Sequence, residues 1–157
     1  MKNELKQELT RRLCECNNGG LVLVMYDIYF GFSDDVKNAF ASDDREALKK
    51  SVADVQAALD ELISALDFKY PIAKQLFSLY SYCKRLFSTV LYTRDLKAAD
   101  EADGIMKKLR GSFETAAKQD NSGPLIGNAQ KVYAGMTYGR TDLNENFIND
   151  DHRGFLA

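Results

Sequence analysis

The chain has 157 residues, of which 45% are hydrophobic and 28% are charged, and its formal net charge is −2. This length suits one domain with a sizeable core, and the composition excludes a chain that is disordered throughout. The longest apolar run, residues 21–26, is too short to span a membrane, and the first residues lack the apolar stretch of a secretory signal. Near-neutral charge gives no general attraction to nucleic acid. We therefore expect a soluble, cytoplasmic protein with no nucleic-acid partner and no membrane insertion.

Histidine and cysteine, which carry much of enzyme and metal chemistry, are scarce in this chain. The single histidine, His152, has no neighbour that could orient it as a base, so we interpret it as a solvated residue rather than a catalytic one. Cys14, Cys16 and Cys83 are odd in number and lack metal-binding spacing, which favours reduced thiols. We predict no catalytic residue, no metal site and no cofactor, and hence a protein that is not an enzyme.

Apolar periodicity predicts two helices in the first part of the chain. Segment 3–16 repeats leucine every fourth residue at Leu5, Leu9 and Leu13, which places them on one helix face. Residues 17–20, Asn-Asn-Gly-Gly, are expected to end that helix, because glycine adopts the left-handed conformation that follows helices. A second helix is expected over 21–41, with a core stripe of Leu21, Met25, Ile28, Phe32 and Val36.

Three further helices are predicted over 45–66, 71–94 and 96–117, each with apolar residues at helical spacing. The core stripe of the helix over 71–94 is expected to be Ile72, Leu76, Leu79, Cys83, Leu86 and Val90. Long amphipathic helices with short connections are typical of a bundle. The fold is therefore expected to be all-α: an antiparallel four-helix bundle within residues 1–118, with the short N-terminal helix as a lid and an irregular C-terminal tail over 119–157.

Residues suited to helix starts support these boundaries. Ser42, Asp43 and Asp44 are expected to supply capping oxygens for the helix over 45–66, with Glu46 as the capping-box partner of Asp43. Pro71 suits the first position of the next helix, and Asp95 can cap the last one.

The helices over 45–66 and 71–94 carry opposite charge. Residues 42–67 hold seven acidic and three basic side chains, whereas residues 68–94 hold five basic and no acidic ones. The interpretation that we favour is that the two helices are neighbours whose rims attract each other modestly. The alternative is a basic docking face for an acidic partner.

The helices over 21–41 and 71–94 are also more apolar than a helix with a solvent-facing side requires. Each is expected to carry a surplus apolar stripe beside its core stripe: Leu23, Tyr26, Phe30, Val22 and Tyr29 on the first, and Ala73, Phe77, Tyr80, Phe87, Leu91, Tyr82 and Tyr92 on the second. Something must cover such stripes. Either the N-terminal helix and the tail do so, or an amphipathic partner helix binds there as in a groove.

Three stretches of the sequence together resemble the family of the bacterial flagellar secretion chaperone FliS. They are LVLVMYDIYFGFSDDVKNAF, similar to the family's second helix, IAKQLFSLYSYCKRLFSTVLYTRD, similar to its fourth, and IMKKLRGSFETA, similar to its last. The order and spacing of these stretches carry the resemblance, which covers residues 17–118. Ile28 departs from the family pattern, because a glycine is usual at that position.

The resemblance implies a four-helix-bundle chaperone without enzymatic activity. Such a protein would bind the disordered C-terminal segment of flagellin, prevent premature polymerisation and deliver flagellin to the flagellar type III export apparatus. The alternative is a non-catalytic structural or regulatory helical protein that self-associates or binds an unrelated amphipathic helix. Both interpretations are compatible with a homodimer.

The two surplus stripes are candidates for part of the flagellin-binding surface that the resemblance implies, and Asp27 is added because Tyr26 and Asp27 stand for the family's Tyr-Asp pair. The expected partner-binding residues are Leu23, Tyr26, Asp27, Phe30, Phe77, Tyr80, Tyr82, Phe87 and Leu91.

The tail over 119–157 is longer than the family's usual ending. One hypothesis is that its apolar residues cover the groove until flagellin arrives; the candidates are Val132, Tyr133, Met136 and Tyr138. Alternatively, the tail docks elsewhere or makes only transient contacts.

Overall fold

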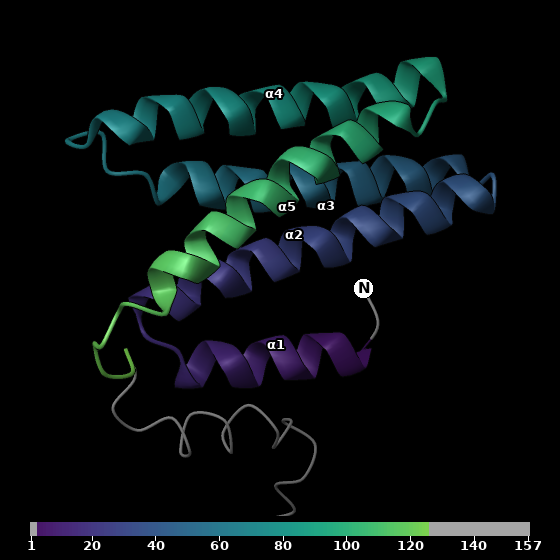
Figure 1. Ribbon diagram of the computed structural model, residues 1–157. Helices are drawn as coiled ribbons and strands as arrows, with labels where there is room; N and C mark the ends of the chain where they lie inside the picture. Colours follow the sequence, from purple (N-terminus) through teal and green to yellow (C-terminus); the bar gives the residue numbers. More distant parts are fainter. Residues whose placement is uncertain (1–2, 126–157) are drawn as a thin grey trace, which may run out of the picture.

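Five helices form the protein, as the computed structural model shows for the residues that it describes, 3–125 (Figure 1). Their bounds are α1 Asn3–Glu15, α2 Asn18–Ala41, α3 Arg45–Ser64, α4 Pro71–Thr93 and α5 Lys97–Ala117. The all-α prediction is confirmed. The expected helix bounds agree within a few residues, with the largest difference at α2, which begins three residues early.

The helices α2 to α5 form a ring. α2 packs against α3 and α5, and α4 packs against the same two helices from the opposite side, while α1 packs only on α2 (Figure 1). The four-helix bundle with an added N-terminal helix is therefore confirmed. Because α1 touches a single helix, it lies outside the ring and does not close an end of the bundle.

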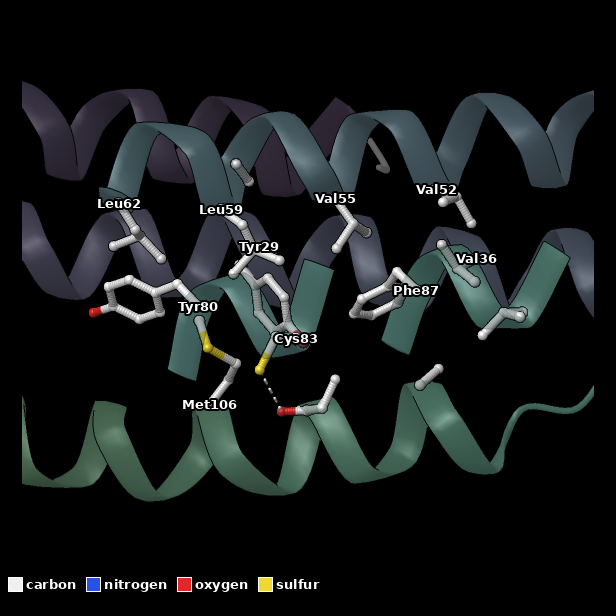
Figure 2. Packing of buried hydrophobic residues seen from close by; sticks show 14 of the residues in the cluster. Tyr29, Val36, Val52, Val55, Leu59, Leu62, Tyr80, Cys83, Phe87 and Met106 are labelled. Carbon is white, nitrogen blue, oxygen red and sulfur yellow. Dashed lines mark hydrogen bonds between the residues drawn. The ribbon is translucent and has the colours of Figure 1, made fainter. Parts of the chain in front are cut away.

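The core of the bundle is apolar and receives side chains from all four ring helices (Figure 2). Its fully buried members include Tyr29, Val36, Val52, Val55, Leu59, Tyr80, Cys83, Phe87, Val90, Ala99, Ala102 and Met106. The small alanines of α5 leave room for larger rings from α2 and α4, such as Phe87, whose centroid lies 6.0 Å from that of Tyr29.

The expected division of α2 into a core stripe and a surplus stripe is wrong. Tyr26 and Tyr29, expected on the surplus side, are fully buried, whereas Met25, Ile28 and Phe32, expected in the core, are only half-buried. The reason is that the rings of Tyr26 and Tyr29 face the aromatic rings of α4 and α5 inside the bundle, whereas α1 packs on the side of α2 that carries Ile28 and Phe32. Apolar side chains are therefore needed around most of the circumference of α2.

The division of α4 is wrong in a different way, because only α3 and α5 cover this helix. Tyr80 and Phe87, expected on the surplus stripe, are buried in the core, whereas Ile72, expected in the core, is 56% exposed. Phe77 is 43% exposed, as expected for a surplus residue. The side of α4 that faces away from its neighbours therefore keeps uncovered apolar side chains.

The helix starts agree in part with the expected capping. Asp44, one of the three expected capping residues, caps α3, where its carboxylate accepts the backbone N–H of Ala47 at 3.0 Å, so the capping box around Asp43 is wrong. The expected left-handed glycines after α1 are also wrong: Asn17 caps α2 by accepting the N–H of Gly20 at 2.8 Å, and no described glycine has a positive φ. Pro71 opens α4 as expected. The N-cap of α5 is Leu96, which makes no side-chain cap hydrogen bond, and Asp95, expected to cap this helix, accepts the N–H of Lys97 at 2.9 Å.

Glycine has a packing role at the start of α2. A Cβ atom on Gly19 would lie 3.0 Å from both Cα and Cβ of Ala117 at the end of α5. The absence of a side chain therefore allows these two helix ends to meet closely.

The oppositely charged helices α3 and α4 are neighbours, as expected. Lys84 pairs with Asp60 at 2.5 Å, and Gln56 donates to Ser88 Oγ at 2.8 Å. Because the ion pair is largely solvent-exposed, its contribution to stability is small. Within residues 3–125, no helix is long and apolar enough to cross a membrane.

Candidate partner-binding site

Three of the expected partner-binding residues are interior side chains. Tyr26, Tyr80 and Phe87 are each at most 1% exposed, so none of them belongs to an uncovered stripe. The hydroxyl groups of Tyr26 and Tyr80 lie 2.7 Å apart and share a hydrogen bond, and burial is the main cause that raises the pKa of both. The Tyr26 ring also packs on Phe113 of α5, with centroids 5.6 Å apart.

The remaining expected residues of α2 and α4 lie at or near the surface. Leu23 and Phe30 are half-buried, whereas Phe77 and Leu91 are exposed. Tyr82 is half-buried, and its hydroxyl donates to Glu101 of α5 at 2.6 Å. These residues are spread over the length of the bundle and do not line one common cavity.

An apolar pocket, which we call the end pocket, opens where the start of α2, the end of α3, the start of α4 and the end of α5 meet. Its cavity is about 170 Å³. The lining combines side chains of all four ring helices and of the loop between α3 and α4: Val22, Met25, Leu62, Ala65, Leu66, Asp67, Tyr70, Ile72, Ala73, Leu76, Tyr80 and Phe113. A pocket with this lining suits an apolar side chain of a partner.

We call four exposed apolar residues the rim of the end pocket: Phe68, Tyr70, Ile72 and Phe77. Tyr70 and Ile72 line the pocket itself, whereas Phe77 lines a hollow between α3 and α4 and Phe68 packs against Phe77. Tyr70 is 64% exposed and Phe68 is 53% exposed. The Phe68 and Phe77 rings stack edge to face with centroids 6.0 Å apart, which extends the apolar surface along α4. Such a group of uncovered large apolar side chains is typical of a docking surface.

Sequence reasoning missed most of this site. Of the nine expected partner-binding residues, only Tyr80 lines the end pocket and only Phe77 belongs to its rim, although Val22 and Ala73 of the surplus stripes also line the pocket. The signal that could have found the site is the aromatic pair Phe68 and Tyr70 in a short interhelical loop, because a loop offers few ways to bury such rings.

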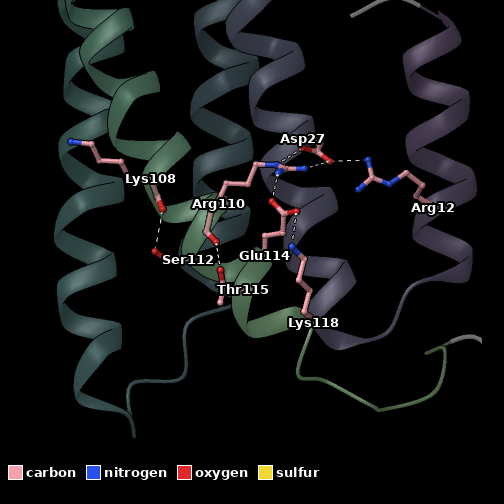
Figure 3. Close-up of polar contacts among 9 residues, drawn as sticks. Arg12, Asp27, Lys108, Arg110, Ser112, Glu114, Thr115 and Lys118 are labelled. Carbon is pink, nitrogen blue, oxygen red and sulfur yellow. Dashed lines mark hydrogen bonds and ion pairs between the residues drawn. The ribbon is translucent and has the colours of Figure 1, made fainter.

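Asp27, also expected in the groove, is instead the centre of an ion cluster that joins three helices (Figure 3). Its carboxylate accepts hydrogen bonds from Arg12 of α1 at 2.7 Å and from Arg110 of α5 at 2.7 and 3.3 Å. Arg110 also pairs with Glu114 at 3.3 Å. The hydrogen bond to Asp27 is the main cause that raises the pKa of Arg110. This geometry gives Asp27 a structural role.

Replacing Asp27 by alanine should loosen α1, because Arg12 and Asp27 form an ion pair across the α1–α2 contact. We expect amide hydrogen exchange within α1 to become about ten times faster. The reason is that the free energy of opening α1 falls by the contribution of one partly buried charged hydrogen bond. Asp34→Ala is the matched control, since Asp34 is an exposed carboxylate on the same helix. Equal exchange in both variants would contradict the assigned role.

A buried polar cluster that the sequence did not reveal lies between α2 and α5. Asp103 accepts hydrogen bonds from Tyr29 at 3.0 Å, Ser33 at 2.8 Å and Lys37 at 2.7 Å. Burial by itself would lower the pKa of Lys37, yet its hydrogen bonds to Asp103 and Asp100 outweigh burial and raise it. Burial is the main cause that raises the pKa of Tyr29, and the charge of Asp103 is the second. The same two causes raise the pKa of Cys83 to about 11.

A second apolar groove runs between α1 and α2, with a cavity of about 270 Å³. Leu9 and Leu13 of α1 face Ile28 and Phe32 of α2 across it. Ile28, which departs from the family pattern noted in the sequence, thus provides apolar surface beside α1. The expected tail residues Val132, Tyr133, Met136 and Tyr138 lie outside the described residues.

The family described as Flagellar protein FliS matches residues 1–120. None of the curated proteins matched the chain. The family match includes all five helices and the end pocket with its rim, and it spans well over half of the sequence. The protein therefore belongs to the FliS family of flagellar secretion chaperones.

Proposed function

We propose that this protein is a cytosolic export chaperone that binds the C-terminal segment of flagellin at the end pocket and its rim. By covering that segment it prevents premature polymerisation, and it delivers flagellin to the flagellar type III export apparatus. The family membership supports the flagellar role. The observation that carries the proposed site is the apolar end pocket, which no helix of the described chain covers.

The chemistry of the end pocket favours an amphipathic, unassembled protein segment as its ligand. Asp67 is the single charged residue in the lining, so the pocket selects apolar side chains. Fully burying one large apolar side chain contributes about 1.5–3 kcal/mol, and the rim residues are roughly half exposed already. Each rim residue therefore contributes about 1 kcal/mol on binding. Several such contacts suit a chaperone that must later release its client.

The other expected residues extend the proposed contact beyond the end pocket. Leu23, Phe30, Tyr82 and Leu91 are at least partly accessible, and a long flagellin segment that wraps around the bundle would meet them in turn. Tyr26 and Phe87 are not proposed as direct contacts, because both are fully buried.

Replacing Ile72 by glutamate should test the proposed site. The charge would stand at the mouth of the end pocket, and we expect affinity for a flagellin C-terminal fragment to fall about tenfold, or 1.4 kcal/mol. Isothermal titration calorimetry with the full chain measures this. Because Ile72 is exposed in the first turn of α4, the free energy of unfolding should change by no more than about 0.5 kcal/mol.

Ala53→Glu is the matched control for Ile72→Glu. Ala53 is exposed in the middle of α3 and belongs to none of the proposed contacts, so the substitution adds the same charge away from the binding surface. We expect unchanged affinity for flagellin in this variant. If Ile72→Glu binds flagellin as tightly as Ala53→Glu does, the end pocket is not the binding site.

A further inference from the structure

The segment that follows α5 is tied to the junction between α1 and α2. Asp120 accepts the backbone N–H of Gly19 at 3.1 Å, and Asn17 donates to the carbonyls of Asp120 at 3.2 Å and Ser122 at 3.3 Å. The N–H of Leu125 donates to the carbonyl of Cys16 at 2.9 Å. These contacts hold the point from which residues 126–157 continue beside the start of α2 (Figure 1).

This departure point lies close to the end pocket. Val22 and Met25 line the pocket three and six residues after Gly19, which is about 5–9 Å along a helix axis. Phe113 lines it from α5, about one turn before that helix ends. Val132 follows Leu125 by seven residues, and an extended chain of that length reaches about 23 Å. The distance therefore allows the tail residues from Val132 onward to reach the pocket.

The sequence of this part of the tail matches the character of the pocket. Residues 132–139, VYAGMTYG, are uncharged and include two tyrosines, a valine and a methionine. Lys131 and Arg140 flank them. An uncharged, apolar stretch thus complements an apolar pocket in whose lining Asp67 is the single charged residue.

We propose that residues 132–138 of this chain occupy the end pocket in the absence of a partner. The N-terminal helix does not take this place, because α1 packs only on α2 and contributes no residue to the pocket lining. A segment attached to the same chain acts at an effective concentration on the order of 1 mM, so even weak apolar contacts fill the pocket.

Occupation by the tail has a consequence for the partner, and this consequence rests on the proposed function. Flagellin must displace the tail, so its apparent affinity is lowered by the fraction of molecules in which the pocket is filled. The tail then shields the apolar rim in the free chaperone and gives way to the client. In this way the chaperone avoids exposing a large apolar surface in the absence of flagellin.

Photo-cross-linking tests the occupation itself without any flagellin. The full chain is prepared with p-benzoylphenylalanine in place of Tyr133, irradiated and analysed by peptide mass spectrometry. We expect intrachain cross-links to residues 62–80, which include most of the pocket lining. The same probe at Asn144 is the control and should not enrich these peptides. Cross-links to the α1–α2 groove, to a second copy, or with the same pattern as the control would overturn the proposal.

A charge substitution in the tail tests the consequence. The full-length variant Val132→Asp, Tyr133→Asp, Met136→Asp keeps the contacts of Asp120 and Ser122, which a deletion from residue 119 would remove. We expect it to bind the flagellin fragment about 3–10 times more tightly than the unaltered chain, because the competing segment is gone. Equal or weaker binding would overturn the shielding role. Failure of Ile72→Glu to weaken flagellin binding would instead count against the proposed function, and the cross-linking result would stand independently.

Discussion

Replacing Phe87 by alanine should lower the free energy of unfolding by about 3–5 kcal/mol, the range seen for a buried phenylalanine that leaves a cavity. Phe87 is fully buried in the core and packs edge to face with Tyr29. The alanines of α5 that line this part of the core are too small to fill the space left behind. Urea unfolding followed by circular dichroism measures the change. Since a domain of this size is stable by only about 5–15 kcal/mol, the loss is a large share of the total.

Phe77→Ala is the matched control for Phe87→Ala, because it makes the same substitution on the same helix. The sequence pattern placed both residues in one surplus stripe, but Phe77 is 43% exposed and belongs to the rim. We expect its unfolding free energy to fall by less than about 1 kcal/mol. The affinity for flagellin should fall in this variant, since a rim contact is lost. Similar stability losses in the two variants would contradict the assignment of Phe87 to the core.

Replacing Asp103 by alanine should cost about 3–4 kcal/mol of unfolding free energy. The substitution leaves the hydroxyl groups of Tyr29 and Ser33 buried without their acceptor, and it deprives Lys37 of its buried partner. These groups lie between α2 and α5, so neither water nor another side chain replaces the carboxylate easily. Guanidinium unfolding of the variant and of the unaltered chain gives the difference.

Asp100→Ala is the control for Asp103→Ala. Asp100 pairs with the same Lys37 at 2.9 Å, but its side chain is 65% exposed. Solvated ion pairs contribute about 0–1 kcal/mol to the free energy of unfolding, so we expect Asp100→Ala to lower it only slightly. If Asp103→Ala proves no more costly than Asp100→Ala, the buried cluster does not stabilise the α2–α5 contact.

These expectations separate residues that hold the bundle together from residues that are free to bind a partner. The aromatic side chains of α2 and α4 belong to both groups, and their sequence spacing does not distinguish them. Asp27 shows the same ambiguity among charged residues: it was expected at the groove, yet it joins α1, α2 and α5 through Arg12 and Arg110. For this reason we propose the end of the bundle as the binding site, because apolar residues remain uncovered there.

The sequence alone determined the class of fold and the number and approximate bounds of the helices. Apolar residues at helical spacing, Pro71 at a helix start and capping residues such as Asp44 are local signals, because each acts within one or two helical turns. The sequence also predicted the family, since the order of three helical stretches carries that resemblance. The attraction between α3 and α4 could be predicted as well, because the excess of acidic side chains on one helix and of basic side chains on the other can be counted in the sequence.

Only the tertiary structure decided which apolar residues are interior and which are free. The number of helices that pack against a helix sets how much of its circumference is covered. The sequence of the helix alone does not specify that number. α2 has α1 as a third neighbour, so Ile28 and Phe32 are half-buried, whereas α4 has two neighbours, so Ile72 and Phe77 remain uncovered. The end pocket and the Asp103 cluster likewise bring together side chains that are far apart in sequence, and such sites form only when the helices pack.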